Sequence, residues 1–177
     1  MRFRLIPALV VALGLTATVA SAQVTKENVQ GITNFSRLET TIACAGATTP
    51  AAVAEVKRLG YASIINLREG SEAGADVDAE AAAAKAAGIT YIHLPFNTAK
   101  PNPAVADQFV AAVTTPANQP AFVHCASANR AAAMWMIKRM LVDGWDADRA
   151  GTEAAALGLT NAALKTFALD YVQTHKP

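Results

Sequence analysis

Short apolar runs alternate with longer helical patterns along most of the chain. Three runs rich in β-branched and aromatic residues, at 61–67, 89–94 and 121–125, predict buried strands. The first of them lies between Gly60 and a polar segment, as expected for a strand that is bounded by turns. A further strand is expected at 39–44, before the first helical segment.

The segments between and after these runs have helical periodicity, at 50–59, 78–87, 103–113, 130–142, 147–156 and 161–174. Thr48 and Pro50 are typical of the start of a helix, as an N-cap and a first-turn residue. Gly60 and Gly88 are typical of helix ends. The signals at both ends of these segments therefore agree with the periodicity.

Strands that alternate with helices predict an α/β fold, with a mostly parallel central sheet of four to five strands flanked by helices. The last part of the chain has no strand pattern, so we expect a C-terminal helical cap. Residues 23–37 are polar and show no clear period, which indicates an irregular N-terminal extension. The predicted domain then occupies residues 38–177.

The first 22 residues have the three-part pattern of a secretory signal peptide. Arg2 and Arg4 give a positive start, residues 5–19 are apolar, and residues 20–22 form a small-residue cleavage site. The apolar run is short for a membrane span, although an uncleaved anchor is the alternative. Cleavage after Ala22 would leave 155 of the 177 residues. We expect this product in a bacterial periplasm, without membrane attachment.

Charge and composition argue against several classes of function. Without the two N-terminal arginines, the 15 basic residues become 13, against 14 acidic residues. Such a balance argues against nucleic acid or an anionic membrane as a partner. His93, His124 and His175 have no metal-ligand spacing, so we expect no metal and no cofactor.

The chain has two cysteines, Cys44 and Cys125, and an oxidising compartment would permit one disulfide. Both are expected near the carboxyl ends of strands. A Cys44–Cys125 disulfide would reversibly block a reactive thiolate. The alternative is a buried free thiol at Cys44, because a disulfide requires Cα atoms within about 7 Å of each other.

The segment AFVHCASANRAAAMW, residues 121–135, joins a strand to a helix through a short polar loop. Backbone N–H groups at a helix start lack partners and can bind an anion, and the helix dipole favours it. The planar guanidinium of Arg130 can donate two hydrogen bonds to the same anion. The positive potential of the helix start and of Arg130 also favours the nucleophilic thiolate of Cys125. His124 can orient the loop. Alternatively, Cys125 is a small buried hydrophobe and Arg130 is only solvated.

The segment HCASANR resembles the phosphate-binding loop of the protein tyrosine and dual-specificity phosphatase superfamily. With GYASIINLRE and AAAAKAAGITYIHLPF, it is similar to a bacterial branch, the phosphatase-like domain of beta-lactamase hydrolase-like proteins, over roughly residues 34–171. The resemblance implies that Cys125 is a nucleophile that forms a phosphocysteine and that Arg130 binds the phosphate and the transition state. It also implies a phosphate cradle made by the backbone amides of Ala126, Ser127, Ala128, Asn129 and Arg130.

The loop departs from the usual phosphatase pattern at three points. Four residues separate Cys125 from Arg130, where five are usual. Ala128 replaces the usual glycine, and we expect Asn129 to supply the left-handed backbone position, because Asn tolerates it well. Ala131 replaces the Ser or Thr that helps the thiolate to leave, which predicts slow turnover.

No residue stands out as the general acid. The loop after HLPF, residues 97–102, has no carboxylate where the resemblance would place an Asp. Glu69 and Glu72, after the strand at 61–67, and Asp107, on an expected helix, are the candidates. Each of these carboxylates can equally be a solvated surface group. Arg68 can add positive charge to the site or pair with one of the acids.

Three functions follow from an anion-binding thiol loop. The first is hydrolysis of a phosphomonoester, including phosphotyrosine, in a phosphorylated protein or small molecule. The second is sulfur transfer of the rhodanese type, with a persulfide on Cys125, because the short loop is also found in those enzymes. The third is a non-catalytic domain that binds an anion or a partner. The sequence does not indicate the oligomeric state.

Overall fold

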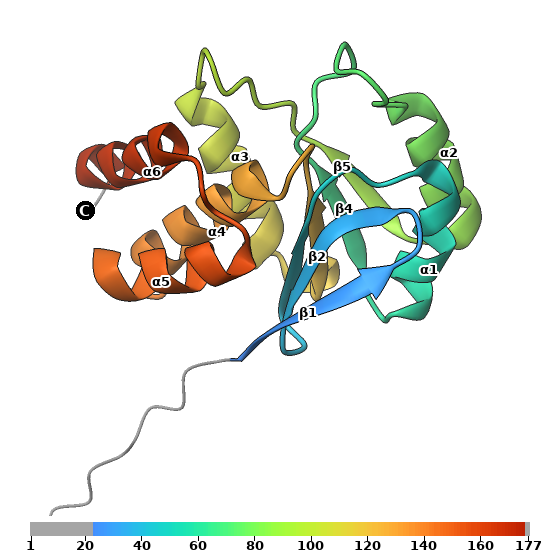
Figure 1. Ribbon diagram of the computed structural model, residues 1–177, viewed down its shortest axis with the longest axis horizontal. Coiled ribbons are helices and arrows are strands. Elements are labelled where there is room, and N and C mark those ends of the chain that lie inside the picture. The colour runs from blue at the N-terminus through green and yellow to red at the C-terminus, as the bar shows by residue number, and fades with distance from the viewer. Residues whose placement is uncertain (1–22, 176–177) are drawn as a thin grey trace, which may run out of the picture.

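The computed structural model describes residues 23–175 as one six-stranded sheet with helices on both faces (Figure 1). The strands are β1 (Val24–Val29), β2 (Ile32–Leu38), β3 (Ile42–Ala45), β4 (Ser63–Asn66), β5 (Thr90–His93) and β6 (Ala121–His124), in the order β1-β2-β3-β6-β4-β5. The helices are α1 (Val53–Arg58), α2 (Val77–Ala87), α3 (Pro103–Thr114), α4 (Asn129–Leu141), α5 (Ala147–Leu157) and α6 (Ala162–His175). Two short 3₁₀ helices lie at Pro50–Ala52 and Pro116–Asn118. The predicted α/β class and mostly parallel sheet are confirmed, with six strands in place of four to five.

The prediction of an irregular segment at 23–37 is wrong, because these residues belong to a β1–β2 hairpin. β2 also pairs antiparallel with β3, so the hairpin extends the parallel part of the sheet. The buried apolar residues of β2, Ile32, Phe35 and Leu38, lie three apart and do not follow the two-residue period of a strand. Phe35 reaches the core and stacks on Phe122 of β6, with ring centroids 6.1 Å apart.

Strands β3, β6, β4 and β5 are parallel, and β6 lies between β3 and β4. Val123 of β6 lies opposite Cys44 of β3 and Ile65 of β4. β3 begins at Ile42, later than expected, because Glu39 has a positive φ of 47° in the turn from β2. The loops that follow the four parallel strands therefore meet at one edge of the sheet, which is where ligands bind in such folds.

Helices α3 to α6 cover one face of the sheet, and α1 and α2 cover the other (Figure 1). α5 and α6 pack on α4 and form the helical cap that the sequence predicts. Trp135 of α4 is 1% exposed and donates its Nε1–H to Glu153 Oε1 of α5 at 2.7 Å. Because α4 is buried along most of its length, its first residues are held firmly against the sheet edge.

The signal peptide expected at residues 1–22 lies outside the described residues. Within residues 23–175, no helix is both long enough and apolar enough to cross a membrane.

Candidate active site

The loop between β6 and α4 has the strand–loop–helix form that the sequence predicts. Cys125 directly follows β6, is fully buried, and donates its backbone N–H to Ala45 O at 3.1 Å. Ala126 and Ser127 are exposed, and α4 begins at Asn129. The thiol is thus enclosed, while the tip of the loop is open to solvent.

Two carbonyl groups of this loop are hydrogen-bonded, whereas the N–H groups of residues 126–130 are not. Ala126 O accepts from Ala47 N at 3.1 Å, and Ser127 O accepts from Asn34 Nδ2 at 3.4 Å. Within residues 23–175, no acceptor is bonded to the backbone N–H groups of residues 126–130. Unpaired donors at the start of a buried helix form a binding arrangement for an anion.

Ala128 has the left-handed conformation, with φ 72°, and the prediction that Asn129 would supply it is wrong. Asn129 is the first residue of α4, and its Oδ1 accepts from the backbone N–H groups of Thr160 at 2.7 Å and Asn161 at 2.8 Å. The carboxamide is therefore committed to the link between α5 and α6, and the turn falls one residue earlier. A left-handed Ala costs about 1 kcal/mol relative to Gly, strain that is common at ligand-binding loops.

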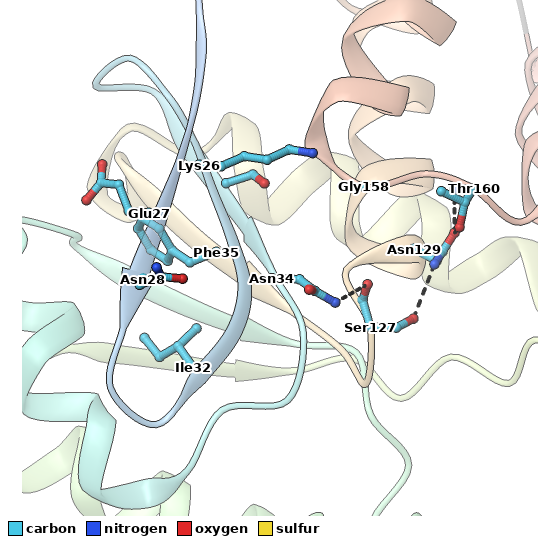
Figure 2. A pocket seen from close by; sticks show the side chains of 11 residues that line it. Lys26, Glu27, Asn28, Ile32, Asn34, Phe35, Ser127, Asn129, Gly158 and Thr160 are labelled. Atoms are coloured by element: carbon cyan, nitrogen blue, oxygen red, sulfur yellow. Dashed lines mark hydrogen bonds between the residues drawn. The ribbon is translucent and has the colours of Figure 1, made fainter.

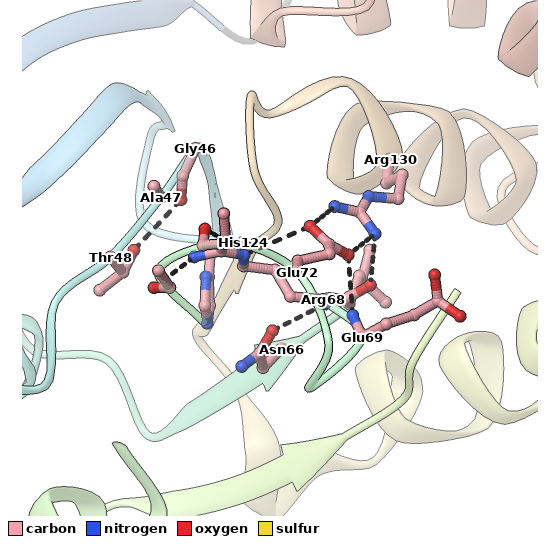
Figure 3. A network of polar contacts seen from close by, with 12 residues as sticks. Gly46, Ala47, Thr48, Asn66, Arg68, Glu69, Glu72, His124 and Arg130 are labelled. Carbon is pink, nitrogen blue, oxygen red and sulfur yellow. Dashed lines mark hydrogen bonds and ion pairs between the residues drawn. The ribbon is translucent and has the colours of Figure 1, made fainter. Parts of the chain in front are cut away.

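Arg130 is 7% exposed and is held by a carboxylate and two backbone carbonyls (Figure 3). Its Nη1 donates to Leu67 O and Phe96 O, each at 3.0 Å, and to Glu72 Oε1 at 2.6 Å. Its Nη2 donates to Glu72 Oε2 at 2.7 Å. Burial lowers the pKa of Arg130, but the Glu72 hydrogen bond and the Coulombic attraction of Cys125 and Glu72 outweigh it and raise this pKa.

One edge of the Arg130 guanidinium thus binds Glu72, and no oxygen within residues 23–175 accepts from its Nε. The Nε side is the second edge of the guanidinium, and Cys125 lies close enough for its charge to raise the pKa of Arg130. A guanidinium whose orientation is fixed by one carboxylate can present its remaining N–H groups to an oxyanion.

Glu72 is placed as a partner of Arg130 and not as a general acid. Burial raises its pKa, but hydrogen bonds from Arg130 and from the Glu69 backbone, together with the Arg130 charge, lower it to about 2. A carboxylate of this kind is ionised at neutral pH and has no proton to donate. Arg68 donates to Glu72 Oε2 at 3.4 Å, and also to Ala73 O at 2.6 Å, so it holds the loop and does not face the anion site.

The two other candidate acids lie in different places. The Glu69 carboxylate accepts from Asn97 Nδ2 at 3.2 Å and 2.9 Å, which joins the loops after β4 and β5. Asp107 accepts from the hydroxyl of Tyr171, a contact between α3 and α6. Burial and this hydrogen bond raise the pKa of Tyr171. Asp107 therefore has a structural partner outside the loop, and the Glu69 carboxylate is bonded to the loop that follows β5.

His124 is fully buried on the opposite side of β6 from the thiol and does not face the anion site. Its Nε2 lies 2.8 Å from Glu80 Oε1 of α2, close enough for an ion pair but without the alignment of a hydrogen bond. Glu80 Oε2 accepts from Asn66 Nδ2 at 2.8 Å and from the Tyr91 hydroxyl at 3.2 Å. Asn66 Oδ1 accepts from the backbone N–H of Arg68 at 2.8 Å. This polar network supports the end of β6, and its bond between Asn66 and Arg68 connects it to the Glu72 loop (Figure 3).

Sequence reasoning missed Glu80 and Asn66. Asn66 interrupts the apolar run IINL, and a polar residue inside a buried strand is a detectable signal. Glu80 lies in an alanine-rich helix with other acids, Asp76 and Asp78, and nothing in the pattern shows that it alone is buried.

Cys44 and Cys125 are both free and buried. Cys44 lies opposite Val123, two residues before Cys125 on the neighbouring strand. Strands about 4.8 Å apart, with a rise of about 3.3 Å per residue, place these Cα atoms roughly 8 Å apart. That separation is too large for a disulfide without backbone movement. Burial and the nearby Cys125 charge raise the pKa of Cys44, so this thiol is a core residue.

Comparison with known proteins agrees with this geometry. Residues 34–142 match the model of the beta-lactamase hydrolase-like protein, phosphatase-like domain. No curated protein matches the chain. Within residues 23–175, no three His, Cys, Asp or Glu side chains lie together as metal ligands.

Several solved structures share the fold. TpbA of P. aeruginosa has a TM-score of 0.65 and 20% identity, over 90% of this chain and 94% of its own. A putative phosphatase of Shewanella putrefaciens CN-32 has a TM-score of 0.68 and 22% identity, over 89% and 96%. The core catalytic domain of the S. cerevisiae PP-IP phosphatase SIW14 has a TM-score of 0.66 and 20% identity, over 81% and 88%. At such identities, the similarity establishes the fold.

The family match extends from within β2 to the end of α4 and includes Cys125, Arg130 and its partner Glu72. The solved structures match about nine tenths of the chain, which is more than the family match covers. The chain therefore belongs to the family of the beta-lactamase hydrolase-like protein, phosphatase-like domain.

Proposed function

We propose that this protein is an exported, cysteine-dependent phosphatase that hydrolyses phosphomonoesters through a phosphocysteine intermediate. The observation that carries the proposal is the set of unpaired amides at 126–130, which lies between the buried Cys125 and the oriented Arg130. Such an arrangement can hold a tetrahedral oxyanion against a thiolate.

Two neighbours suggest the substrate class to test. A cysteine-to-serine variant of TpbA was crystallised in complex with pTyr, and SIW14 is a PP-IP phosphatase. Both neighbours support a phosphorylated protein or a phosphorylated small molecule as the substrate of this chain.

In the first step, the Cys125 thiolate attacks phosphorus. The S–P bond forms as the bond from phosphorus to the leaving oxygen breaks. The amides of residues 126–130 and the second edge of Arg130 hold the equatorial oxygens as their charge grows. Glu72 prevents rotation of the guanidinium, so little reorganisation is needed at that moment.

The leaving oxygen requires a proton in this step. Glu69 follows β4 and is not bonded to an arginine, and its carboxylate is bonded to Asn97, in the loop where the resemblance placed an Asp. We assign Glu69 as the proton donor on this basis. Phosphoesters with acidic leaving groups, such as aryl phosphates, should depend on it least.

In the second step, water attacks phosphorus, the S–P bond breaks, and inorganic phosphate leaves. Ala131 is fully buried and has no hydroxyl to donate to the departing thiolate. Breakdown of the phosphoenzyme is therefore the slow step, and a rapid burst of product should precede steady turnover.

Sulfur transfer is the second candidate, favoured by the four-residue spacing between Cys125 and Arg130.

One paired assay separates the candidates. The mature chain, kept reduced, is tested for aryl phosphate hydrolysis and for sulfur transfer from thiosulfate to cyanide, beside Cys125→Ser. We expect phosphate release that the substitution abolishes. Hydrolysis that survives Cys125→Ser would contradict the proposal, sulfur transfer alone would support the second candidate, and no activity in either assay would support a non-catalytic binding domain.

Export is part of the proposal and is supported by the N-terminal sequence pattern alone. Expression of the full chain in a bacterium should yield a periplasmic product that begins at Gln23, as measured by intact mass. A full-length product retained in the membrane would contradict it.

A further inference from the structure

A groove runs along the outer side of the phosphate-binding loop (Figure 2). It has a volume of about 690 Å³ and lies between the β1–β2 hairpin and the start of α4. The hairpin contributes Lys26 and Asn34, and the opposite wall includes Ser127, Asn129 and Thr160.

The groove and the anion site share residues. Ser127 and Asn129 belong to the loop, and their side chains line the groove, joined by a hydrogen bond from Asn129 Nδ2 to Ser127 Oγ at 3.3 Å. Asn34 connects the two walls through its bond to Ser127 O. The groove lies on the side of the loop where Ser127 O accepts from Asn34, and neither Cys125 nor Arg130 lines it. A substituent on a phosphate held by the loop therefore reaches the groove past Ser127 and Asn129, at the sheet edge where ligands bind.

The charges along the groove are unequal. Glu27 lies 3.3 Å from Arg37 Nε, and Figure 2 shows its carboxylate directed away from Ser127 and Asn129. Within residues 23–175, Lys26 has no acidic partner within ion-pair distance. Its ammonium extends from β1 across the groove toward Gly158 (Figure 2).

The rest of the lining is polar and neutral, with a small apolar floor. Carboxamides and hydroxyls at Asn28, Asn34 and Thr160 can bind carbonyl or hydroxyl groups. Ile32 and Phe35 are buried and give the floor its apolar character. One uncompensated cation among neutral polar groups fits a polar ligand that carries negative charge.

We propose that this groove binds the leaving group of the substrate, and that Lys26 selects phosphoesters that carry a second anionic group on that leaving group. This inference rests on the proposed function. Lys26 and the ligand remain partly solvated, so its effect on kcat/KM is modest, about three- to fivefold at low salt, and is screened by added salt.

The test uses two probes that differ by one charge: the N-acetyl dipeptide amides phosphotyrosyl-glutamate and phosphotyrosyl-glutamine. A second pair, with the Glu or Gln before the phosphotyrosine, covers the other direction of binding. Because the leaving phenol is the same, any difference in kcat/KM reports on the added carboxylate. Wild type, Lys26→Gln, the charge-preserving Lys26→Arg and the control Lys85→Gln, an exposed lysine of α2, are compared.

We expect wild type to prefer one Glu probe over its Gln partner, Lys26→Gln to lose that preference, and Lys26→Arg and Lys85→Gln to retain it. The preference should also disappear in 0.5 M salt, where the screening length is only a few ångströms, roughly 4 Å. Equal losses of kcat/KM on the Glu and Gln probes, or an unchanged preference in Lys26→Gln, would overturn this inference. The proposed phosphatase function would not be affected by either result. If wild type hydrolyses neither probe pair nor an aryl phosphate, the proposed function itself fails and the inference fails with it.

Discussion

Each end of the phosphate-binding loop rests on a glutamate, but the two glutamates lie in different surroundings. At the strand end, Glu80 is 3% exposed and contacts His124, which is fully buried. At the helix end, Glu72 is only partly buried in a loop and holds Arg130 by two bonds. At the strand end, both side chains are buried and cannot reach a ligand, so they can only support the loop. At the helix end, the Nε side of Arg130 remains able to bind a ligand. Substitutions of Glu80 should therefore act on stability, whereas substitution of Arg130 should act on catalysis.

The largest expected effect is at the helix end. Arg130→Lys should reduce kcat/KM for an aryl phosphate by about a hundredfold or more, since an ammonium lacks the planar pair of donors and the loss of one such donor costs about 10²–10³ in rate. Steady-state kinetics on the folded variant measure this, with Arg58→Lys, an exposed arginine of α1, as the control. Near wild-type activity in Arg130→Lys would contradict the claim that the planar guanidinium stabilises the transition state.

At the strand end, Glu80→Ala should lower the free energy of unfolding by about 3 kcal/mol. The reason is that His124, Asn66 and Tyr91 would keep buried polar groups without their partner. Urea unfolding measures the loss, and Asp78→Ala on the same helix, where the side chain is exposed, should change stability by about 0.5 kcal/mol or less. Equal small effects at both positions would mean that the buried pair does not support the loop.

Packing of the loop against the cap predicts a smaller effect. Gly158 has φ 117°, and a Cβ there would lie 3.0 Å from Ala128 Cβ. Gly158→Ala should therefore destabilise the fold by about 1–2 kcal/mol, through backbone strain and this contact. Gly60→Ala has a similar φ of 92° but nothing within 4 Å, so it measures the strain alone. Gly158→Ala should lose more unfolding free energy than Gly60→Ala, and this difference should disappear when Ala128→Gly is added. A difference that persists would mean that the contact with Ala128 Cβ is not its cause.

The smallest effect concerns the charge of Glu72. Its pKa is lowered from 4.5 to about 2 in the folded chain, so its ion pair stabilises the fold above pH 4.5 and this contribution is lost as pH falls toward 2. Glu72→Gln should cost about 0.5–1 kcal/mol at pH 7, as expected for a partly exposed pair, and progressively less below pH 4.5. Urea unfolding at several pH values measures the difference, and a difference that grows at low pH would have the wrong sign for this account.

The sequence predicted the parallel sheet, the helical cap and the loop, because each has a local signal: apolar runs, helix ends, or a Cys and an Arg around a short polar segment. It missed the β1–β2 hairpin, since the buried residues of β2 lie three apart and resemble no strand. The expectation for Asn129 failed for another reason. Its preference for a left-handed backbone was overridden by two hydrogen bonds to the α5–α6 link, far away in sequence.

The supporting carboxylates show the same limit. Glu72 was a candidate acid by position, but its role depends on an arginine more than fifty residues later, 2.6 Å away in the fold. Glu80 was not noticed at all, because burial of one acid among several on an alanine-rich helix depends on which side of α2 faces the sheet. The chemistry of a single residue can be predicted from the sequence. Pairs of residues from distant elements can be identified only when the three-dimensional structure is known.

The central claim is that Cys125 attacks phosphorus, and trapping the intermediate tests it most directly. Wild type mixed with an aryl phosphate and quenched in acid after a few turnovers should carry the mass of one phosphoryl group on the peptide that contains Cys125. Ala131→Ser should reduce the fraction trapped, because a hydroxyl at that position speeds release of the thiolate. A phosphoryl group on any other residue, or rapid hydrolysis with no adduct on Cys125, would contradict the account.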